Sequence, residues 1–156
     1  YAYFYDKNCI ISVLEFAEEG NLYQKLKRLG KNEGFSEPSL KNNSAADRRS
    51  LVPAVEKRNH RDIKPENILV IDSNSWHIKL CDFGWSTHSI NQSRSTFCGT
   101  PDYLAPELAK RGNLSYDDKI DNWAVGILTY ELLTGASPFA PPVQGQDTQN
   151  DIYKNI

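Results

Sequence analysis

The sequence predicts an α+β fold in which short strands precede and interrupt a mostly helical body. Three observations lead to this prediction: an apolar strand-like run at 9–14, two short strand-like runs around a turn at 68–80, and a long apolar helical segment at 117–134. With 156 residues, the chain is long enough for one domain with a hydrophobic core.

The composition is that of a soluble globular protein, with 39% hydrophobic and 24% charged residues. A formal net charge of -2 gives no general reason to expect nucleic acid or membrane binding. No apolar run approaches the roughly 20 residues that a bilayer span needs, and no signal peptide is visible. Cys9, Cys81 and Cys98 have no paired spacing, which argues against a disulfide framework or a zinc site and favours a reducing, intracellular location.

The first third of the chain predicts a strand, a connector and a helix. Branched apolar residues at 9–14 indicate a short buried strand, and residues 15–20 break that pattern. Three leucines then recur at helical spacing between 22 and 29, with Gly30 as the expected stop. Residues 34–59 are poor in apolar side chains, so no core helix is predicted there.

The middle of the chain predicts a β-hairpin. Residues 68–71 are a strand candidate, 72–75 form a cluster of turn residues, and 77–80 alternate as a half-buried strand does. The polar residues 86–94 that follow are expected to form a loop.

The segment 117–134 predicts a helix, with acidic residues in its first turn and Gly135 just past its end. Its apolar residues cover most of the helix circumference. A helix of this kind is expected to be buried as a central pillar.

The most informative block is the octet His60-Arg61-Asp62-Ile63-Lys64-Pro65-Glu66-Asn67, which fits the catalytic loop of protein kinases. In phosphoryl transfer, Asp62 would orient an incoming hydroxyl and accept its proton, and Lys64 would offset charge on the transferred phosphate. Asn67 offers an oxygen to magnesium. The alternative is an ordinary polar turn between two strands.

Further blocks follow in a fixed order. Asp82-Phe83-Gly84 comes directly after the predicted hairpin, where an Asp is chemically suited to magnesium; by itself this tripeptide would mark only a turn. Ala105-Pro106-Glu107 comes next, and then Asp121, Trp123 and Gly126 on the predicted helix. Together with the octet these make four blocks, and their order along the chain resembles that of the protein kinase superfamily.

Finer features resemble the Aurora family. These are Asp82 to Ser86 with a Trp after the Gly, the segment Arg94 to Thr100, and the segment Glu15 to Tyr23. Trp85 as a plain hydrophobic contact would instead fit another basophilic serine/threonine kinase. The resemblance covers 1–34 and 57–156.

The resemblance implies a protein-kinase-like fold seen in part. Residues 1–14 would end the small lobe, 15–20 would form the hinge, and 21–156 would belong to the α-rich large lobe, with 34–59 atypical. Most of the small lobe and the closing helices of the large lobe are not within the sequence.

The resemblance also implies ATP and Mg²⁺ as cofactors, with magnesium held by Asn67 and Asp82. Further nucleotide-binding positions are Leu14 behind the adenine pocket, the backbone of Glu15 and Ala17, Leu69 beneath the adenine ring, and Glu66. Glu66 has two other interpretations: it would bind an Arg that precedes the phosphorylated residue of a substrate, or it would simply be exposed to solvent.

In the same way, Thr96 is expected to be an activating phosphosite whose phosphate pairs with Arg61, or else a solvated loop residue. Thr100 would act beside Asp62, as a further catalytic residue that places the substrate hydroxyl. Structural roles are expected for His60, Arg61, Phe83, Gly84, Glu107 and Asp121, with His60 packed against Phe83 and Asp121.

The implied function is an ATP-dependent serine/threonine kinase in mitotic and cell-cycle control, acting on protein substrates with basic residues upstream of Ser or Thr. An activator protein on the small lobe is implied, as is a location in the cytoplasm or nucleus, at the spindle, centrosome or chromosomes. Direct partners among nucleic acids or membranes are not expected.

The sequence also departs from the family pattern. It contains no glycine-rich loop, no strand lysine for the α- and β-phosphates, and no helix glutamate to pair with that lysine. We therefore expect this fragment to transfer little or no phosphate by itself. A non-catalytic kinase-like scaffold and a truncated gene product are the alternatives.

Overall fold

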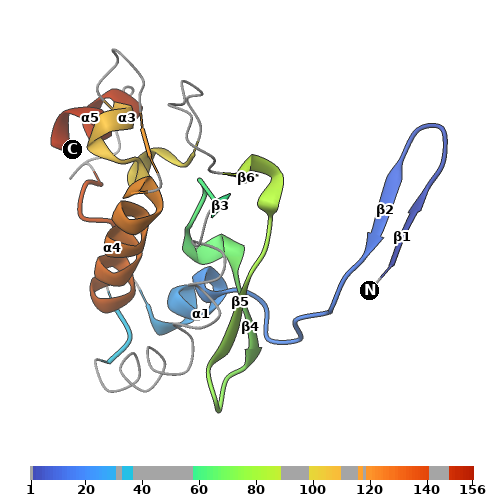
Figure 1. Cartoon of the computed structure of the whole chain (residues 1–156). Helices are drawn as coiled ribbons and strands as arrows, with labels where there is room; N and C mark the ends of the chain where they lie inside the picture. The colour runs from blue at the N-terminus through green and yellow to red at the C-terminus, as the bar shows by residue number, and fades with distance from the viewer. Residues whose placement is uncertain are drawn as a thin grey trace.

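The computed structural model describes residues 2–30, 33–36, 58–88, 99–109, 116–117, 119–140 and 148–156. Within these residues the protein is α+β, with small antiparallel sheets and short helices lying to one side and at one end of a longer helix (Figure 1). The predicted α+β class is therefore confirmed. Thr96, Cys98 and most of the 34–59 stretch lie outside the described residues.

The strands are β1 (Ala2–Tyr5), β2 (Ile10–Val13), β3 (Arg58–Asn59), β4 (Ile68–Asp72), β5 (His77–Leu80) and β6 (Thr87–His88). The α-helices are α1 (Leu22–Leu29), α3 (Pro106–Ala109), α4 (Lys119–Thr134) and α5 (Thr148–Asn155). The 3₁₀ turns are η1 (Pro65–Asn67), η2 (Phe83–Trp85) and η3 (Pro101–Tyr103). Elements β2, β4, β5, α1 and α4 were predicted; the others give no comparable periodic signal.

Helix α1 begins and ends where the sequence predicts. Its N-cap Asn21 forms a capping box, because its side chain accepts a hydrogen bond from Gln24 N (2.9 Å) while Gln24 Oε1 accepts one from Asn21 N (3.2 Å). Gly30 follows the last turn with a φ of 122°, which favours glycine. Leu22 and Leu26 are buried and anchor the helix to the core.

Strands β4 and β5 form the predicted hairpin, with Ile68 opposite Leu80 and Val70 opposite Ile78. The Asp72 side chain accepts hydrogen bonds from Asn74 N and Ser75 Oγ, which stabilises the turn. The open end of this hairpin carries the two sequence blocks predicted to bind magnesium.

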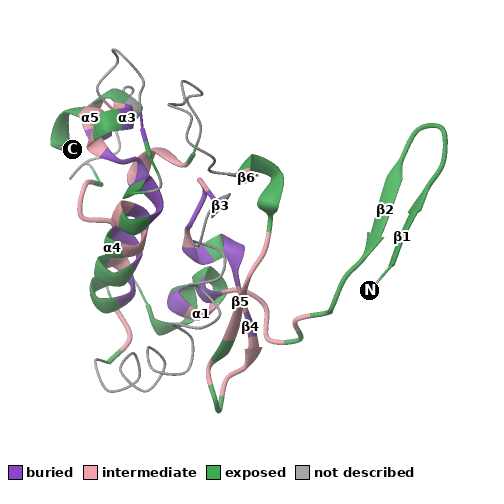
Figure 2. Cartoon of the chain, viewed as in Figure 1, coloured by how far each residue is buried: buried purple, intermediate pink, exposed green. Residues whose placement is uncertain are grey.

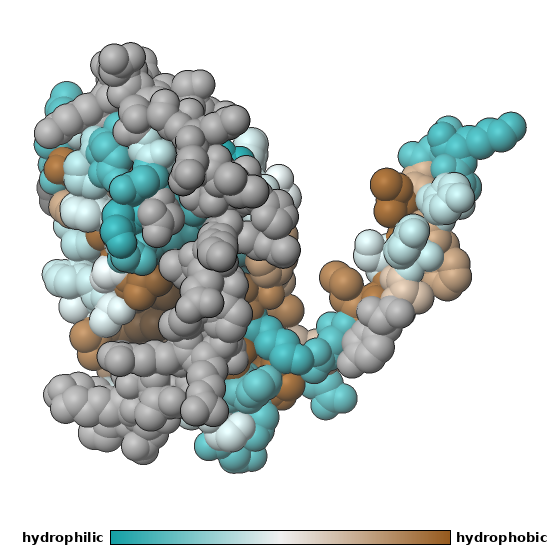
Figure 3. All heavy atoms as spheres, in the orientation of Figure 1, coloured by the Kyte–Doolittle hydropathy of each residue, from teal (hydrophilic) through white to brown (hydrophobic). Residues whose placement is uncertain are grey.

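Strands β1 and β2 form a hairpin that projects from the rest of the molecule (Figures 1 and 3). Strand β2 was predicted to be buried, and this is wrong: Ile10 is 79% and Ile11 56% exposed (Figure 2). Among the described residues, these two strands form a sheet of their own, with no third strand beside them. The apolar run therefore specifies strand structure, but not the surface that would bury it.

Helix α4 contributes one buried stripe to the core. Ile120, Ala124, Ile127 and Leu128 follow the spacing of a single helix face and are buried, whereas Leu133 is 43% exposed. The prediction of burial all round is thus wrong, because the described neighbours pack on one side only (Figure 2). The main core consists of Leu22, Ile63, Ile68, Val70, Tyr103, Ala124, Ile127, Leu128 and Leu132.

The polar stretch 86–94 was predicted to be a loop, and its beginning is not. Thr87 and Asn59 are paired in a two-residue antiparallel ladder between β6 and β3. A ladder of this length leaves no periodic pattern in the sequence. Residues 89–94 lie outside the described residues.

The segment 33–36 packs tightly on the end of α4, where Phe35 N donates to Leu132 O at 2.7 Å. A Cβ on Gly34 would lie 2.0 Å from Leu133 O. Gly34→Ala is therefore expected to lower the free energy of unfolding by about 1–3 kcal/mol, the usual range for overpacking.

Urea unfolding of the two matched Gly→Ala variants checks this prediction. Gly126 lies within α4 with nothing within 4 Å of an added Cβ, so Gly126→Ala is expected to raise stability by about 1 kcal/mol through helix propensity. Equal effects of the two substitutions would contradict the close approach at Gly34.

In the part of the chain that the structure describes, every helix is too short or too polar to cross a bilayer.

Candidate active site

Helix α4 holds the segment 60–67 in place through one buried carboxylate. Asp121 Oδ2 accepts a hydrogen bond from His60 N (2.7 Å), and Asp121 Oδ1 accepts one from Arg61 N (2.9 Å). Asp121 is 2% exposed. Burial raises the pKa of this carboxyl, although the two N–H donors oppose the shift.

Arg61 lies at the sharp turn that these bonds create. Its φ is 66°, a left-handed conformation that costs a non-glycine residue about 1–2 kcal/mol. Its guanidinium donates from Nε to Trp85 O (2.6 Å) and from one terminal nitrogen to the hydroxyl of Tyr116 (3.0 Å). Arg61 therefore links the loop to the segment after Asp82 and to Tyr116, which precedes α4.

His60 is packed beneath the loop. Its Nε2 lies 3.0 Å from Cys81 O, and since a carbonyl can only accept, Nε2 carries the hydrogen. The Phe83 ring approaches the imidazole edge-on, with 5.0 Å between ring centroids. His60 and Phe83 thereby connect the octet to the segment 82–84, where Gly84 N donates to Asp82 Oδ1 at 3.3 Å.

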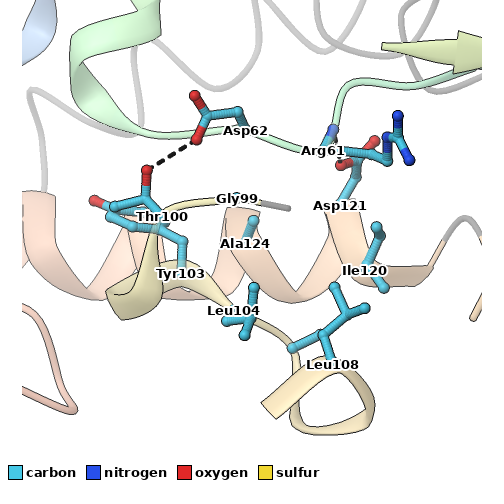
Figure 4. A pocket seen from close by; sticks show the side chains of 11 residues that line it. Arg61, Asp62, Gly99, Thr100, Tyr103, Leu104, Leu108, Ile120, Asp121 and Ala124 are labelled. Atoms are coloured by element: carbon cyan, nitrogen blue, oxygen red, sulfur yellow. Dashed lines mark hydrogen bonds between the residues drawn. The ribbon is translucent and has the colours of Figure 1, made fainter. Parts of the chain in front are cut away.

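Asp62 is the centre of a compact hydrogen-bonded cluster, of which Figure 4 draws the bond to Thr100. Its Oδ1 accepts a hydrogen bond from Thr100 Oγ1 (2.9 Å), and its Oδ2 lies 2.9 Å from Lys64 Nζ. Lys64 Nζ also donates to Thr100 Oγ1 (2.9 Å). Asn67 Nδ2 donates to both Asp62 O (2.8 Å) and Asp62 Oδ2 (2.9 Å). Asp62 and Thr100 are 38 residues apart in sequence.

The charge state of Asp62 follows from this cluster. Burial by itself would raise the pKa of Asp62, but hydrogen bonds from Lys64, Thr100 and Asn67 and the charge of Lys64 outweigh it, so the net pKa is lowered. Asp62 is thus held as a carboxylate with its oxygens directed at donors.

Asn67 and Asp82 are brought to the same end of the β4–β5 hairpin. Cys81 N donates to Asn67 O at 2.9 Å, so Asp82 follows one residue later. Asp82 has a φ of 58°, and its side chain is exposed. Because Asn67 donates through its amide nitrogen, its amide oxygen is the atom that suits a cation. One amide and one carboxylate oxygen fit magnesium, which prefers few protein oxygens plus phosphate and water.

The residues predicted to contact adenine are only partly assembled. Leu69 and Ala17 are half-buried, and Gly20 O accepts a hydrogen bond from Val70 N (2.8 Å), which brings residues 17–20 against β4. Leu14 is 75% exposed and lies on the projecting side of this connection. Glu15 forms an exposed ion pair with Lys79.

An acidic group that sequence reasoning largely missed surrounds Tyr103, which is 8% exposed. The Tyr103 hydroxyl donates to Glu131. Burial raises the pKa of Glu131, the bond from Tyr103 opposes this, and the negative charges of Glu66 and Asp102 raise it further. The sequence signal that could have indicated this group is Glu131, which interrupts the mostly apolar second half of α4. Glu66 is exposed, and so is Glu107 on α3.

A small cavity lies under the cluster, between the octet, the segment 99–108 and α4 (Figure 4). Its volume is about 20 Å³, which is room for roughly one water molecule. Asp62 and Thr100 lie on one side, and the apolar side chains of Leu104, Leu108 and Ile120 lie on the other.

Comparison with known proteins gives a consistent result. Residues 1–156 match the protein kinase domain. The chain is 44% identical over 159 residues to an Aurora kinase of Schizosaccharomyces pombe, and the aligned region covers 100% of this chain and 41% of that protein. It is 42% identical over 157 residues to serine/threonine-protein kinase Aurora-1 of Arabidopsis thaliana, and the aligned region covers 100% of this chain and 49% of that protein. An Aurora kinase of Dictyostelium discoideum is 38% identical over 157 residues, covering 100% of this chain and 38% of that protein. The chain thus spans less than half the length of these relatives.

Proposed function

This chain belongs to the protein kinase family, and on that premise we propose that it is part of an Aurora-like, ATP- and magnesium-dependent kinase that transfers the γ-phosphate to serine and threonine hydroxyls of proteins. The observation that carries the proposal is the cluster in which Asp62, Lys64 and Thr100 exchange hydrogen bonds.

The Thr100 hydroxyl supports this proposal because it is chemically the same as the acceptor of a threonine kinase. It donates to Asp62 Oδ1 and accepts from Lys64 Nζ. A substrate hydroxyl that donates to the same carboxylate would have its oxygen aligned for attack, and Lys64 would lie beside the charge that develops on the phosphate.

A lowered pKa makes Asp62 a weak base, so its main contribution would be orientation of the hydroxyl, with late acceptance of the proton. Asn67 and Asp82 would hold magnesium, which when bound neutralises charge on the phosphate oxygens. The backbone of Glu15 and Ala17 would hold adenine over Leu69, with Leu14 behind it.

The acidic group of Glu66, Asp102 and Glu131 supports a preference for basic residues upstream of the acceptor. The negative charges of this group repel one another, since those of Glu66 and Asp102 both raise the pKa of Glu131. A substrate Arg would relieve this repulsion and form charge-assisted hydrogen bonds.

The experiment that tests this function is transfer of labelled γ-phosphate from ATP to matched peptides, with or without Arg upstream of Ser, by the product of the complete reading frame. Exposed Glu66→Gln is expected to raise the peptide KM about tenfold for the Arg peptide only, as loss of one charge-assisted bond would. An equal change for both peptides would contradict the assignment of Glu66. Absence of any transfer by the unaltered protein would favour the non-catalytic scaffold.

The isolated chain 1–156 is expected to transfer little phosphate, because its sequence contains no glycine-rich loop and no lysine–glutamate pair of the family type. We extend the proposal to mitotic and cell-cycle control, with Thr96 as the activating phosphosite paired to Arg61, an activator on the small lobe, and action at the spindle, centrosome or chromosomes. Imaging of the tagged protein through mitosis tests this cellular part.

A further inference from the structure

The residues between the projecting hairpin and α1 are attached to the β4–β5 hairpin at several points. We call residues 15–21 the linker. Gly20 N donates to Ala17 O (3.2 Å), which closes a turn, and Gly20 O accepts from Val70 N (2.8 Å). Asn21 then forms an isolated β-bridge with Leu69. These bonds place the linker backbone directly beside β4.

A second attachment is made by side chains, which we call the Glu19 clamp: Glu19, Lys25 and Ser73. Glu19 Oε1 accepts a hydrogen bond from Ser73 N (2.8 Å), and Glu19 Oε2 accepts from Ser73 Oγ and from Lys25 Nζ (2.5 Å). Lys25 Nζ also donates to Ser73 Oγ (2.5 Å). The clamp therefore joins the linker, α1 and the turn between β4 and β5.

The clamp is partly shielded from water, and its Glu19 is a carboxylate at neutral pH. The side chain of Lys25 is 15% exposed and that of Glu19 is 32% exposed. Hydrogen bonds from Lys25 and Ser73 lower the pKa of Glu19 to about 2. Since 54 residues separate Glu19 from Ser73, the clamp fixes a contact that local structure alone does not supply.

The position of the clamp relates it to the proposed nucleotide site. Ala17 lies two residues before Glu19, and Leu69 lies on the strand that leads into Ser73. Adenine held between linker backbone and Leu69 requires a fixed spacing between these two segments. Errors of about 1 Å in such a spacing are enough to weaken binding or slow a reaction markedly.

We propose that Glu19 is a positioning residue for the nucleotide: the Glu19 clamp holds the linker backbone at Ala17 and the side chain of Leu69 at the separation that an adenine ring needs. This inference rests on the proposed function, since it takes the nucleotide site as given. It adds a role for three side chains that do not touch the nucleotide.

The test is binding of a fluorescent Mg²⁺–adenine nucleotide to the product of the complete reading frame. The variants are Glu19→Gln, Lys25→Met and the double variant. Each single substitution is expected to weaken binding about three- to tenfold, as loss of a partly exposed charge-assisted bond would. The double variant is expected to bind no more weakly than Glu19→Gln, because both changes break one unit.

The matched control is Glu18→Gln, which makes the same change of charge in the same turn on an exposed side chain. It is expected to bind like the unaltered protein. Hydrogen exchange at Val70 N and Ser73 N supplies a readout that needs no nucleotide: Glu19→Gln is expected to speed exchange at both amides, and Glu18→Gln at neither.

The outcomes are distinguishable. Nucleotide binding that Glu19→Gln leaves unchanged would overturn this inference and leave the proposed function intact. An equal loss of nucleotide affinity in Glu18→Gln would show that the effect comes from net charge, and it would also overturn this inference. Failure of the unaltered protein to bind adenine nucleotide would overturn both proposals. A loss of affinity with Tm within about 4 °C of the unaltered protein, a shift of roughly 1 kcal/mol, would support positioning over general stability.

Discussion

Replacing Asp62 by Asn is expected to lower kcat for peptide phosphorylation by about 10²- to 10⁴-fold, the range for loss of a positioned acid–base group. The carboxylate accepts hydrogen bonds from Thr100 and Asn67 and pairs with Lys64. An amide in its place would turn an NH₂ toward one of these donors and lose the charge that is proposed to align a substrate hydroxyl. The KM for ATP is expected to change little, since Asp62 is not among the residues proposed to hold adenine.

Steady-state kinetics of the complete protein measures this effect. Asp151→Asn is the matched control, because the Asp151 side chain is 44% exposed on α5 and its ion-pair partner in the described part of the chain is the exposed Lys154. Full activity in Asp62→Asn would contradict the proposed role of Asp62. Loss of nucleotide binding as well as kcat would indicate collapse of the loop rather than loss of its chemistry.

The contribution of Asp62 to stability depends on pH with a definite sign. The folded pKa of Asp62 is lowered from 3.8, so its contribution to stability is present above that ordinary value and is lost as the pH falls through the lower folded value. Asp62 is therefore expected to stay ionised from neutral pH down to about 4. A carboxyl NMR titration that placed its midpoint above 4 would contradict this charge state.

Replacing Asp121 by Ala is expected to lower the free energy of unfolding by about 4 kcal/mol. The two amides that Asp121 accepts from, His60 N and Arg61 N, would be left without their acceptor in a buried site, at about 1–3 kcal/mol each. The left-handed conformation of Arg61 would also lose the bonds that maintain it.

Denaturant unfolding measures this loss, and Asn122→Ala is the control, because Asn122 is exposed on the same turn of α4. That control is expected to stay within about 0.5 kcal/mol of the unaltered protein. Equal stability of Asp121→Ala and Asn122→Ala would show that the octet is held by other contacts. Since Asp62 directly follows Arg61, kcat is expected to fall together with stability.

Local patterns predicted the elements whose signal lies within a few residues. Leucine spacing with Gly30 as the stop indicated α1, and the turn residues 72–75 indicated the β4–β5 hairpin. The octet with Asp62, Lys64 and Asn67 was recognised because its residue types and spacing are specific. In contrast, β3 and β6 have two residues each, too few for any period to show.

Burial was predicted less well than secondary structure. Strand β2 and helix α4 have the apolar residues of buried elements, yet β2 is exposed and α4 is buried along one stripe. An apolar composition indicates only that a segment can form a buried surface. Which surface is covered depends on the elements that pack against it, and these come from distant parts of the chain.

The sequence by itself determined the family, the α+β class and the identity of the chemical groups, because these depend on residue types and short spacings. Only the tertiary structure decided which groups meet: Thr100 with Asp62, Asp121 with the backbone of His60 and Arg61, and Glu19 with Ser73. These pairs are separated by 38 to 61 residues. Their contact requires closure of long loops, whose entropy is offset by the packing of the whole core rather than by any local pattern.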